Sequence, residues 1–180
     1  MRAFAALYEE LDTTQSTNLK VAAMSRYFRD APPADAAWAT YILSGRRLKR
    51  FIDPALLKRW LIEQAALPEW LIDESYSSVG DLAETIALLT AGTAHSESSS
   101  DDTALADWIE ERLLPLRDAD DDVQRQTITG WWRELPYRQC FLLNKLLTGE
   151  LRVGVSQLLV TRALADVTGI ERTELAGRLM

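Results

Sequence analysis

Cysteine and histidine are almost absent from this sequence, which contains one of each. The single Cys140 cannot form an internal disulfide. It lies in the apolar run CFLLNKLL, so we expect a small buried side chain rather than a reactive thiol. His95 has no cysteine or histidine neighbour at the spacing of metal ligands, so we expect a solvated loop residue. The sequence thus offers no basis for redox chemistry or for a zinc centre.

Long apolar runs and catalytic motifs are also missing. There is no stretch of 18 or more apolar residues, and the N-terminus MRAFAALYEELD turns acidic too early for a secretory signal, so we expect a cytosolic protein that does not associate with membranes. The sequence shows no Ser or Cys nucleophile near a histidine base, no metal-ligand cluster and no phosphate loop. We therefore predict a binding module with no catalytic and no metal-binding residues of its own.

The net charge of −7 is unusual for a protein that binds nucleic acid, but the charge is unevenly distributed. Residues 1–60 hold 10 Lys/Arg against 6 Asp/Glu, residues 61–122 hold 2 against 16, and residues 123–180 hold 8 against 5. An acidic middle between two basic ends is compatible with a basic surface formed by the first and last thirds of the chain. The pattern therefore permits DNA binding without proving it.

Apolar residues recur at helical spacing throughout, and no stretch alternates as a β-strand would. We predict an all-α fold, a compact bundle of about ten helices in two lobes with no sheet. Residues 92–102, GTAHSESSSDD, contain too few apolar side chains to offset the entropy of ordering them, so we expect a mobile linker there. The lobes would then span about residues 1–91 and 103–180.

Capping residues predict where several helices begin. Ser16 or Thr17 can cap the helix LKVAAMSRYFRD, and Asp53 followed by a proline is typical of a helix start. The acidic run from Asp118 to Asp122 could suggest a metal site, but it precedes VQRQTITGWWREL, and carboxylates are favourable at a helix N-terminus. We expect a helix start there. The six tryptophans lie in amphipathic segments, so we expect burial and assign none to base stacking.

A basic segment, SGRRLKRFIDP, is the first candidate for a binding site. It places Arg46, Arg47, Lys49 and Arg50 between one helix end and the next helix start. Such a cluster could bind backbone phosphates, but a solvated basic loop is an equally good interpretation of this segment alone, because short basic clusters are weakly specific.

The second candidate is the segment LLTGELRVGVSQLLVTRALADV. Gly149 ends a helix, Arg152 follows, Gly154 allows close backbone approach, and Ser156 occupies the position of an N-cap. Free N–H groups at the new helix start, the Ser156 hydroxyl and the Arg152 guanidinium could converge on one phosphate. The alternative is an ordinary turn between helices that carries a surface arginine.

Three blocks of this sequence resemble the N-terminal DNA-binding domain of ATP-dependent DNA ligases, especially the shorter bacterial enzymes. The blocks are LSGRRLKRFIDPALLKRW, PEWLIDESYSSVGDLAETIALL and LLNKLLTGELRVGVSQLLVTRALADVTGI, and together they anchor most of residues 1–180. The resemblance implies a helical domain that grips nicked duplex DNA on both sides of the nick, mainly through the backbone in the minor groove.

The resemblance also implies roles for individual residues. Gly149, Arg152, Gly154 and Ser156 match the family's phosphate-contacting turn, and Arg46 and Arg47 match its basic segment, with Lys49 and Arg50 following. The block around Gly80, Asp81 and Glu84 has a structural explanation as a capped helix start, so we do not include it among the contacts.

The family's adenylation motif, Lys-x-Asp-Gly, occurs nowhere in the chain. We therefore expect the catalytic adenylation domain to lie outside these 180 residues and the chain alone to be inactive. By the resemblance, ATP and magnesium serve the parent ligase and this chain needs no cofactor. Its partners would be nicked double-stranded DNA and the ligase's own adenylation and OB-fold domains. We expect a monomer in the bacterial cytosol, associated with the nucleoid. The alternative function is a helical scaffold whose acidic middle segment binds a basic protein.

Overall fold

The structure is a computed structural model, and it describes residues 1–46, 48–90 and 103–179. Every regular element in these ranges is helical, and eleven helices are present when the continuous run over residues 105–116 is counted once. The prediction of an all-α fold is therefore confirmed for the described residues. The linker expected at residues 92–102, with His95 inside it, lies outside them.

The chain forms two compact units, and neither is a continuous stretch of sequence. Unit 1 comprises residues 1–48, 104–106 and 151–180, and unit 2 comprises residues 49–103 and 107–150. These units interleave along the chain, whereas the lobes expected from the sequence follow one another. The reason is long-range packing, because a helix formed near the C-terminus packs against one formed near the N-terminus.

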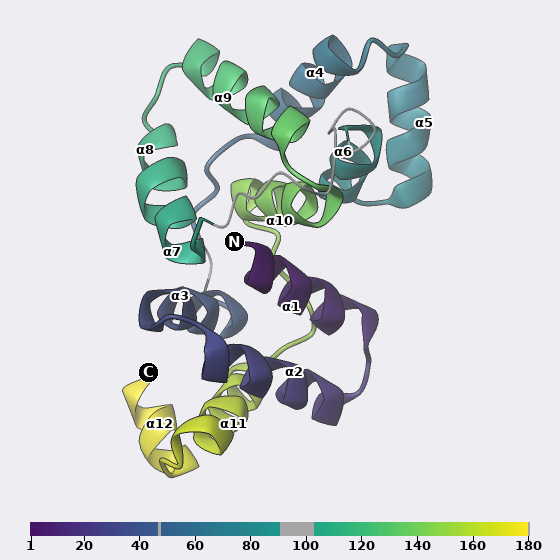
Figure 1. Ribbon diagram of the computed structural model, residues 1–180. Coiled ribbons are helices and arrows are strands. Elements are labelled where there is room, and N and C mark those ends of the chain that lie inside the picture. The colour runs from purple at the N-terminus through teal and green to yellow at the C-terminus, as the bar shows by residue number, and fades with distance from the viewer. Residues whose placement is uncertain (47, 91–102, 180) are drawn as a thin grey trace. The chain divides into compact units, whose positions relative to one another are not determined.

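Unit 1 is built around the pairing of α2 with α11, which lie side by side in Figure 1. Its helices are α1 (Arg2–Thr13), α2 (Thr17–Asp30), α3 (Pro33–Leu43), α11 (Gln157–Thr168) and α12 (Arg172–Arg178). The helix α1 buries Phe4, Tyr8 and Leu11 at helical spacing, and α2 contributes Met24 to the same core. The packing of α2 against α11 joins segments more than a hundred residues apart.

Unit 2 is built around the pairing of α6 with α10 (Figure 1). Its main helices are α4 (Pro54–Ala65), α5 (Glu69–Val79), α6 (Leu82–Thr90), α9 (Asp121–Glu134) and α10 (Tyr137–Thr148). The side chain of Trp132 is fully buried, and its indole N–H donates to Asn144 Oδ1 at 3.0 Å. Because the indole N–H keeps a partner, a large aromatic ring can be buried without the cost of an unpaired donor.

The helical run over residues 105–116 changes between α-helical and π-helical hydrogen bonding along its length. It consists of α7 (Leu105–Asp107), the π-helical segment η1 (Trp108–Leu113) and α8 (Leu114–Leu116). Within unit 1, the buried carboxylate of Asp35 accepts hydrogen bonds from the N–H groups of Leu105 and Ala106, at 3.1 and 2.9 Å. A carboxylate at a helix N-terminus satisfies donors that have no partner inside the helix.

Several helix starts predicted from the sequence are confirmed. Ser16 caps α2 by accepting from Leu19 N, and Asp53 caps α4 by accepting from Ala55 N at 2.8 Å. The acidic run also behaves as expected, because α9 begins at Asp121 with two acidic residues in its first turn. Cys140 is buried, and burial raises the pKa of its thiol to about 11.

The predicted burial of the six tryptophans is confirmed only in part. Trp60, Trp108 and Trp132 are buried, whereas Trp38 and Trp131 are half-buried. Trp70 has 68% of its surface exposed, so the expectation of burial is wrong for this residue. The reason is its position on α5, where it lies on the face opposite the one that packs against the unit.

Candidate nucleic-acid interface

The turn at residues 151–156, which leads into α11, is held in place by a buried lysine. Lys20 of α2 is 5% exposed, and its ammonium group donates to the carbonyl oxygens of Val153 and, at 3.3 Å, of Gly154. Gly154 has a φ of +60°, and a Cβ at this position would lie 3.0 Å from Lys20 Nζ. The left-handed backbone therefore favours glycine here, and the Lys20 ammonium group would have to move by a few tenths of an ångström to make room for a Cβ.

The same contact orients the donors of the turn. In a trans peptide the C=O group and the N–H of the following residue point in opposite directions, and the described residues contain no cis peptide. Because two carbonyls point at Lys20, the N–H groups of Gly154 and Val155 point away from it. Within the described part of the chain, these two N–H groups have no hydrogen-bond acceptor.

The first turn of α11 adds further donors. Ser156 is the N-cap, but its side chain makes no capping bond, and the first helical N–H bonded back to its carbonyl is that of Leu159. The N–H groups of Gln157 and Leu158 therefore have no acceptor among the described residues. N–H groups at a helix start, together with the helix dipole, favour an anion.

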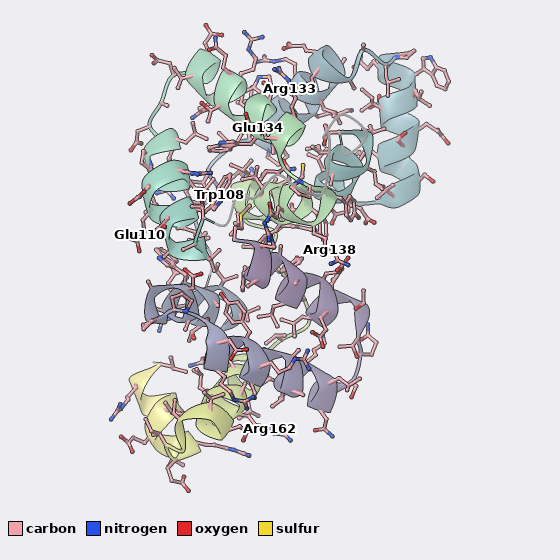
Figure 2. All side chains as sticks on the ribbon, viewed as in Figure 1. Trp108, Glu110, Arg133, Glu134, Arg138 and Arg162 are labelled. Carbon is pink, nitrogen blue, oxygen red and sulfur yellow. The ribbon has the colours of Figure 1, made fainter. Side chains whose placement is uncertain are left out.

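Positive charge lies near these donors in the sequence. Arg152 is exposed, and its guanidinium has no hydrogen bond or ion pair to any described residue. On α11 itself, Arg162, labelled in Figure 2, donates to Asn18 Oδ1 at 3.1 Å and is only half-buried. The turn thus combines backbone donors with an unpaired cation, the arrangement expected of a phosphate site.

Arg46 reaches the same part of unit 1 from α3. Its guanidinium donates to the carbonyl oxygen of Leu179 at 2.7 Å, and the Gln157 amide donates to the same oxygen at 3.5 Å. The basic segment and the start of α11 therefore meet at the end of α12. Arg46 also has a structural role, because a cation at a helix C-terminus stabilises the last carbonyls.

The remaining residues predicted for the site belong to unit 2, except Arg47, which lies outside the described residues. Lys49 and Arg50 are exposed, and the backbone just after them is fixed by Phe51 N–H and Ile52 N–H, which donate to Leu147 O at 3.0 and 3.3 Å. In unit 2, therefore, the basic segment adjoins the C-terminus of α10.

Gly149 ends α10 in the left-handed conformation, with a φ of 73°. The N–H of Gly149 bonds to Leu146 O and that of Glu150 to Lys145 O, the paired bonds of a Schellman motif. Gly149 thus has a structural role as a helix terminator. Gly149 belongs to unit 2, whereas the N–H donors of the turn belong to unit 1.

The block around Asp81 is a helix start, as the sequence analysis predicted. Asp81 Oδ1 accepts from Glu84 N at 3.0 Å, and Gly80 closes the preceding helix with a φ of 78°. The other carboxylate oxygen of Asp81 forms an ion pair with Lys145 of α10. These contacts account for the block without a ligand.

Sequence analysis missed two contributors to the turn, Lys20 and Gln157. Gln157 follows the predicted cap directly, so its position in the first helical turn was the signal that could have found it. Lys20 lies 133 residues from Val153 in sequence, and nothing near it in sequence indicated this contact.

A polar groove between α4 and α9 in unit 2 was also missed. It is lined by Trp60, Glu63, Gln64, Arg125, Gln126, Thr129 and Arg133. Arg125 pairs with Glu63 at 3.5 Å, whereas Arg133, labelled in Figure 2, has no ion pair with a described residue. The groove therefore carries a small excess of positive charge.

Two absences hold for residues 1–46, 48–90 and 103–179. These residues contain no group of three or more His, Cys, Asp or Glu side chains that could hold a metal ion. None of their helices combines the length and the apolar character needed to cross a bilayer.

Comparison with known proteins identifies a family. The family described as "DNA ligase N terminus" matches residues 1–165. A search of curated proteins found no match to the chain. Because the family match covers most of the sequence, the chain belongs to the DNA ligase N-terminal family, as an N-terminal domain of an ATP-dependent DNA ligase.

Proposed function

We propose that this domain binds the backbone of nicked duplex DNA, and that the turn at residues 151–156 with the start of α11 receives one phosphate. The observation that carries the proposal is the contact of Lys20 with two carbonyls of the turn. This contact directs the carbonyl oxygens, which would repel a phosphate, into the unit, and it leaves the N–H donors facing away beside Arg152. A phosphate would accept from those donors and pair with the guanidinium.

Arg46 supplies a second cation to this phosphate site. Its guanidinium donates to Leu179 O, which holds the cation at the end of α12, where Gln157 of α11 also donates. Because Arg46 is tethered to the end of α12, its cost of ordering on binding is smaller than that of a free side chain. We expect Arg46 to contribute less than Arg152, because its guanidinium already donates to Leu179 O.

Unit 2 would add a further contact through Lys49 and Arg50. Both side chains are exposed and have no partner among the described residues, while the adjoining backbone is anchored at Leu147. A mobile cation on a fixed backbone suits a phosphate, which carries charge but no sequence information. Affinity would therefore depend on salt and on duplex shape, with little base readout.

In the parent ligase, the domain would hold the nick close to the adenylation and OB-fold domains. Such tethering raises the effective concentration of the nick at the catalytic centre without contact with the reacting atoms. We assign ATP and magnesium to the adenylation domain, because none of the chain's lysines stands in a Lys-x-Asp-Gly motif.

The test is to replace Arg152 by alanine and to measure duplex binding at about 50 and about 200 mM salt. Removal of one phosphate contact should weaken binding by about tenfold and reduce the salt slope by about one unit, with the melting temperature unchanged. The matched control is Arg29→Ala. Arg29 is exposed near the end of α2, about 13 Å along the helix from Lys20.

Arg29→Ala should leave the affinity close to that of the unmodified chain. If the two variants bind DNA equally well, the turn is not a phosphate site. If Arg152→Ala instead lowers the melting temperature and leaves binding unchanged, the turn is only a structural connector.

A further inference from the structure

The exposed tryptophan of α5 marks a surface that the DNA proposal does not use. Trp70 has 68% of its surface exposed, while Trp60, Trp108 and Trp132 in the same unit are almost fully buried. Tryptophan carries more apolar surface than any other side chain and is largely buried on average. Its exposure on a helix of a folded unit therefore requires an explanation.

The geometry of α5 shows that Trp70 cannot turn inward. The only buried residue of this helix is Ile72. Successive residues of an α-helix are about 100° apart, so Trp70 lies about 160° from Ile72 around the helix axis. The residues on its own face, one and two turns further on, are Glu74 and Ser77, and both are exposed. Trp70 thus stands at the centre of the outward face of α5.

Carboxylates outnumber cations around this face, which Lys58 of α4 borders. Residues 61–90 contain six acidic residues and no lysine or arginine. Asp73 pairs with Lys58 of α4, but Glu74 has no ion pair among the described residues. Glu69, directly before Trp70, also has no ion-pair partner in that part of the chain. Glu69 does interact electrostatically with Lys58, so of the two carboxylates that flank Trp70 along the helix only Glu74 has no cation beside it.

This charge decides which partner fits. Proteins that stack nucleobases on aromatic side chains place them in positively charged grooves, because the strand carries phosphates. Carboxylates on both sides of Trp70 would repel a strand. A protein surface with an apolar pocket and a basic rim has the complementary charge, and exposed tryptophans are frequent anchors of such interfaces.

We propose that the outward face of α5, defined by Glu69, Trp70, Glu74 and Ser77, docks a basic protein partner, with Trp70 as the apolar anchor. The proposed DNA contacts all lie on other segments of the chain. One domain could then hold DNA and a basic protein at the same time.

The experiment uses the chain labelled with 5-fluorotryptophan and fluorine NMR, with the Trp70 resonance assigned by its loss in Trp70→Phe. The probe is an amphipathic peptide with leucine on one helical face and lysine on the other. Its counterpart has glutamate in place of lysine. The lysine peptide should shift the Trp70 resonance saturably, more than the other five, and the glutamate peptide should not.

Two substitutions and two controls test the anchor and the charge. Trp70→Ala should weaken binding of the lysine peptide by about tenfold or more. Glu74→Lys should also weaken this binding and reduce its salt dependence. Val123→Ala removes another exposed apolar side chain of unit 2, and Asp118→Lys reverses another exposed carboxylate. Both controls should leave peptide affinity unchanged, and none of the four variants should weaken binding to DNA.

Three results would overturn the proposal. The lysine peptide could fail to shift the Trp70 resonance, or Trp70→Ala could bind it as tightly as the unmodified chain. The Trp70 resonance could also respond to single-stranded DNA, or to protein concentration alone, which would make the face a nucleic-acid contact or a self-association surface.

Discussion

Replacing Gly154 by alanine tests whether Lys20 determines the shape of the turn. The backbone at Gly154 has a φ of +60°, and the added Cβ would lie 3.0 Å from Lys20 Nζ. A left-handed conformation costs an alanine about 1 to 2 kcal/mol, part of which is offset because alanine also restricts the unfolded chain. Displacement of the ammonium group adds up to about 1.5 to 3 kcal/mol, the contribution of a hydrogen bond to a charged donor.

Gly169→Ala provides the matched control in the same unit. Gly169 ends α11 with a φ of +70°, and nothing lies within 4 Å of its added Cβ. This variant should lose about 1 kcal/mol of unfolding free energy through backbone strain alone. Gly154→Ala should lose about 2 to 4 kcal/mol. Urea denaturation followed by circular dichroism measures both values, and the order of the melting temperatures should agree with them.

A double-mutant cycle with Lys20→Met isolates the contact itself. Without the ammonium group, Gly154→Ala should cost no more than Gly169→Ala costs in the unmodified chain. The reasoning is refuted if Gly154→Ala and Gly169→Ala destabilise the chain equally in the presence of Lys20. It is also refuted if the extra cost of Gly154→Ala persists in the Lys20→Met background.

Three further predictions concern the core and the chemistry of the chain. Burial raises the pKa of the Cys140 thiol from 9.0 to about 11, so the contribution of this thiol to stability should be constant below pH 9 and fall between these values, where only the unfolded thiol ionises. A thiol reagent at pH about 8 should modify Cys140 only as the chain unfolds, and rapid modification of the folded chain would contradict its burial. Asn144→Ala leaves the buried Trp132 N–H without its acceptor and should cost about 1 to 3 kcal/mol in urea denaturation, well above the cost of Asn18→Ala at an exposed position. Labelled ATP with magnesium should leave no covalent adenylate on the chain, and a labelled band that survives denaturation would contradict this.

Local features of the fold could be predicted because neighbouring residues determine them. Ser16 and Asp53 each satisfy N–H groups two or three residues ahead, so a helix start can be recognised from a short stretch of sequence. Helical spacing of apolar residues likewise predicted the all-α class. The division into interleaved units depends on which amphipathic faces meet, and many pairings satisfy the same pattern. The exposure of Trp70 could not be predicted for the same reason, because the sequence does not show which face of α5 packs against the unit.

The candidate site was predicted in part for similar reasons. Glycines, a cap position and an arginine within eight residues identified the turn that ends at Ser156. The interpretation of Gly154 changes, because its close neighbour in the structure is Lys20. The meeting of Arg46 with the start of α11 at Leu179 depends on tertiary packing across 133 residues. No local pattern carries that information.

Duplex binding and its salt dependence test the central claim most directly. The unmodified chain is titrated with nicked duplex, intact duplex and single-stranded DNA at about 50 and about 200 mM salt. We predict that nicked duplex binds at the lower salt concentration, that its affinity falls steeply at the higher one, and that single-stranded DNA binds more weakly. The absence of any duplex binding at the lower salt concentration would contradict the assignment of this domain to the DNA backbone and favour the helical scaffold instead.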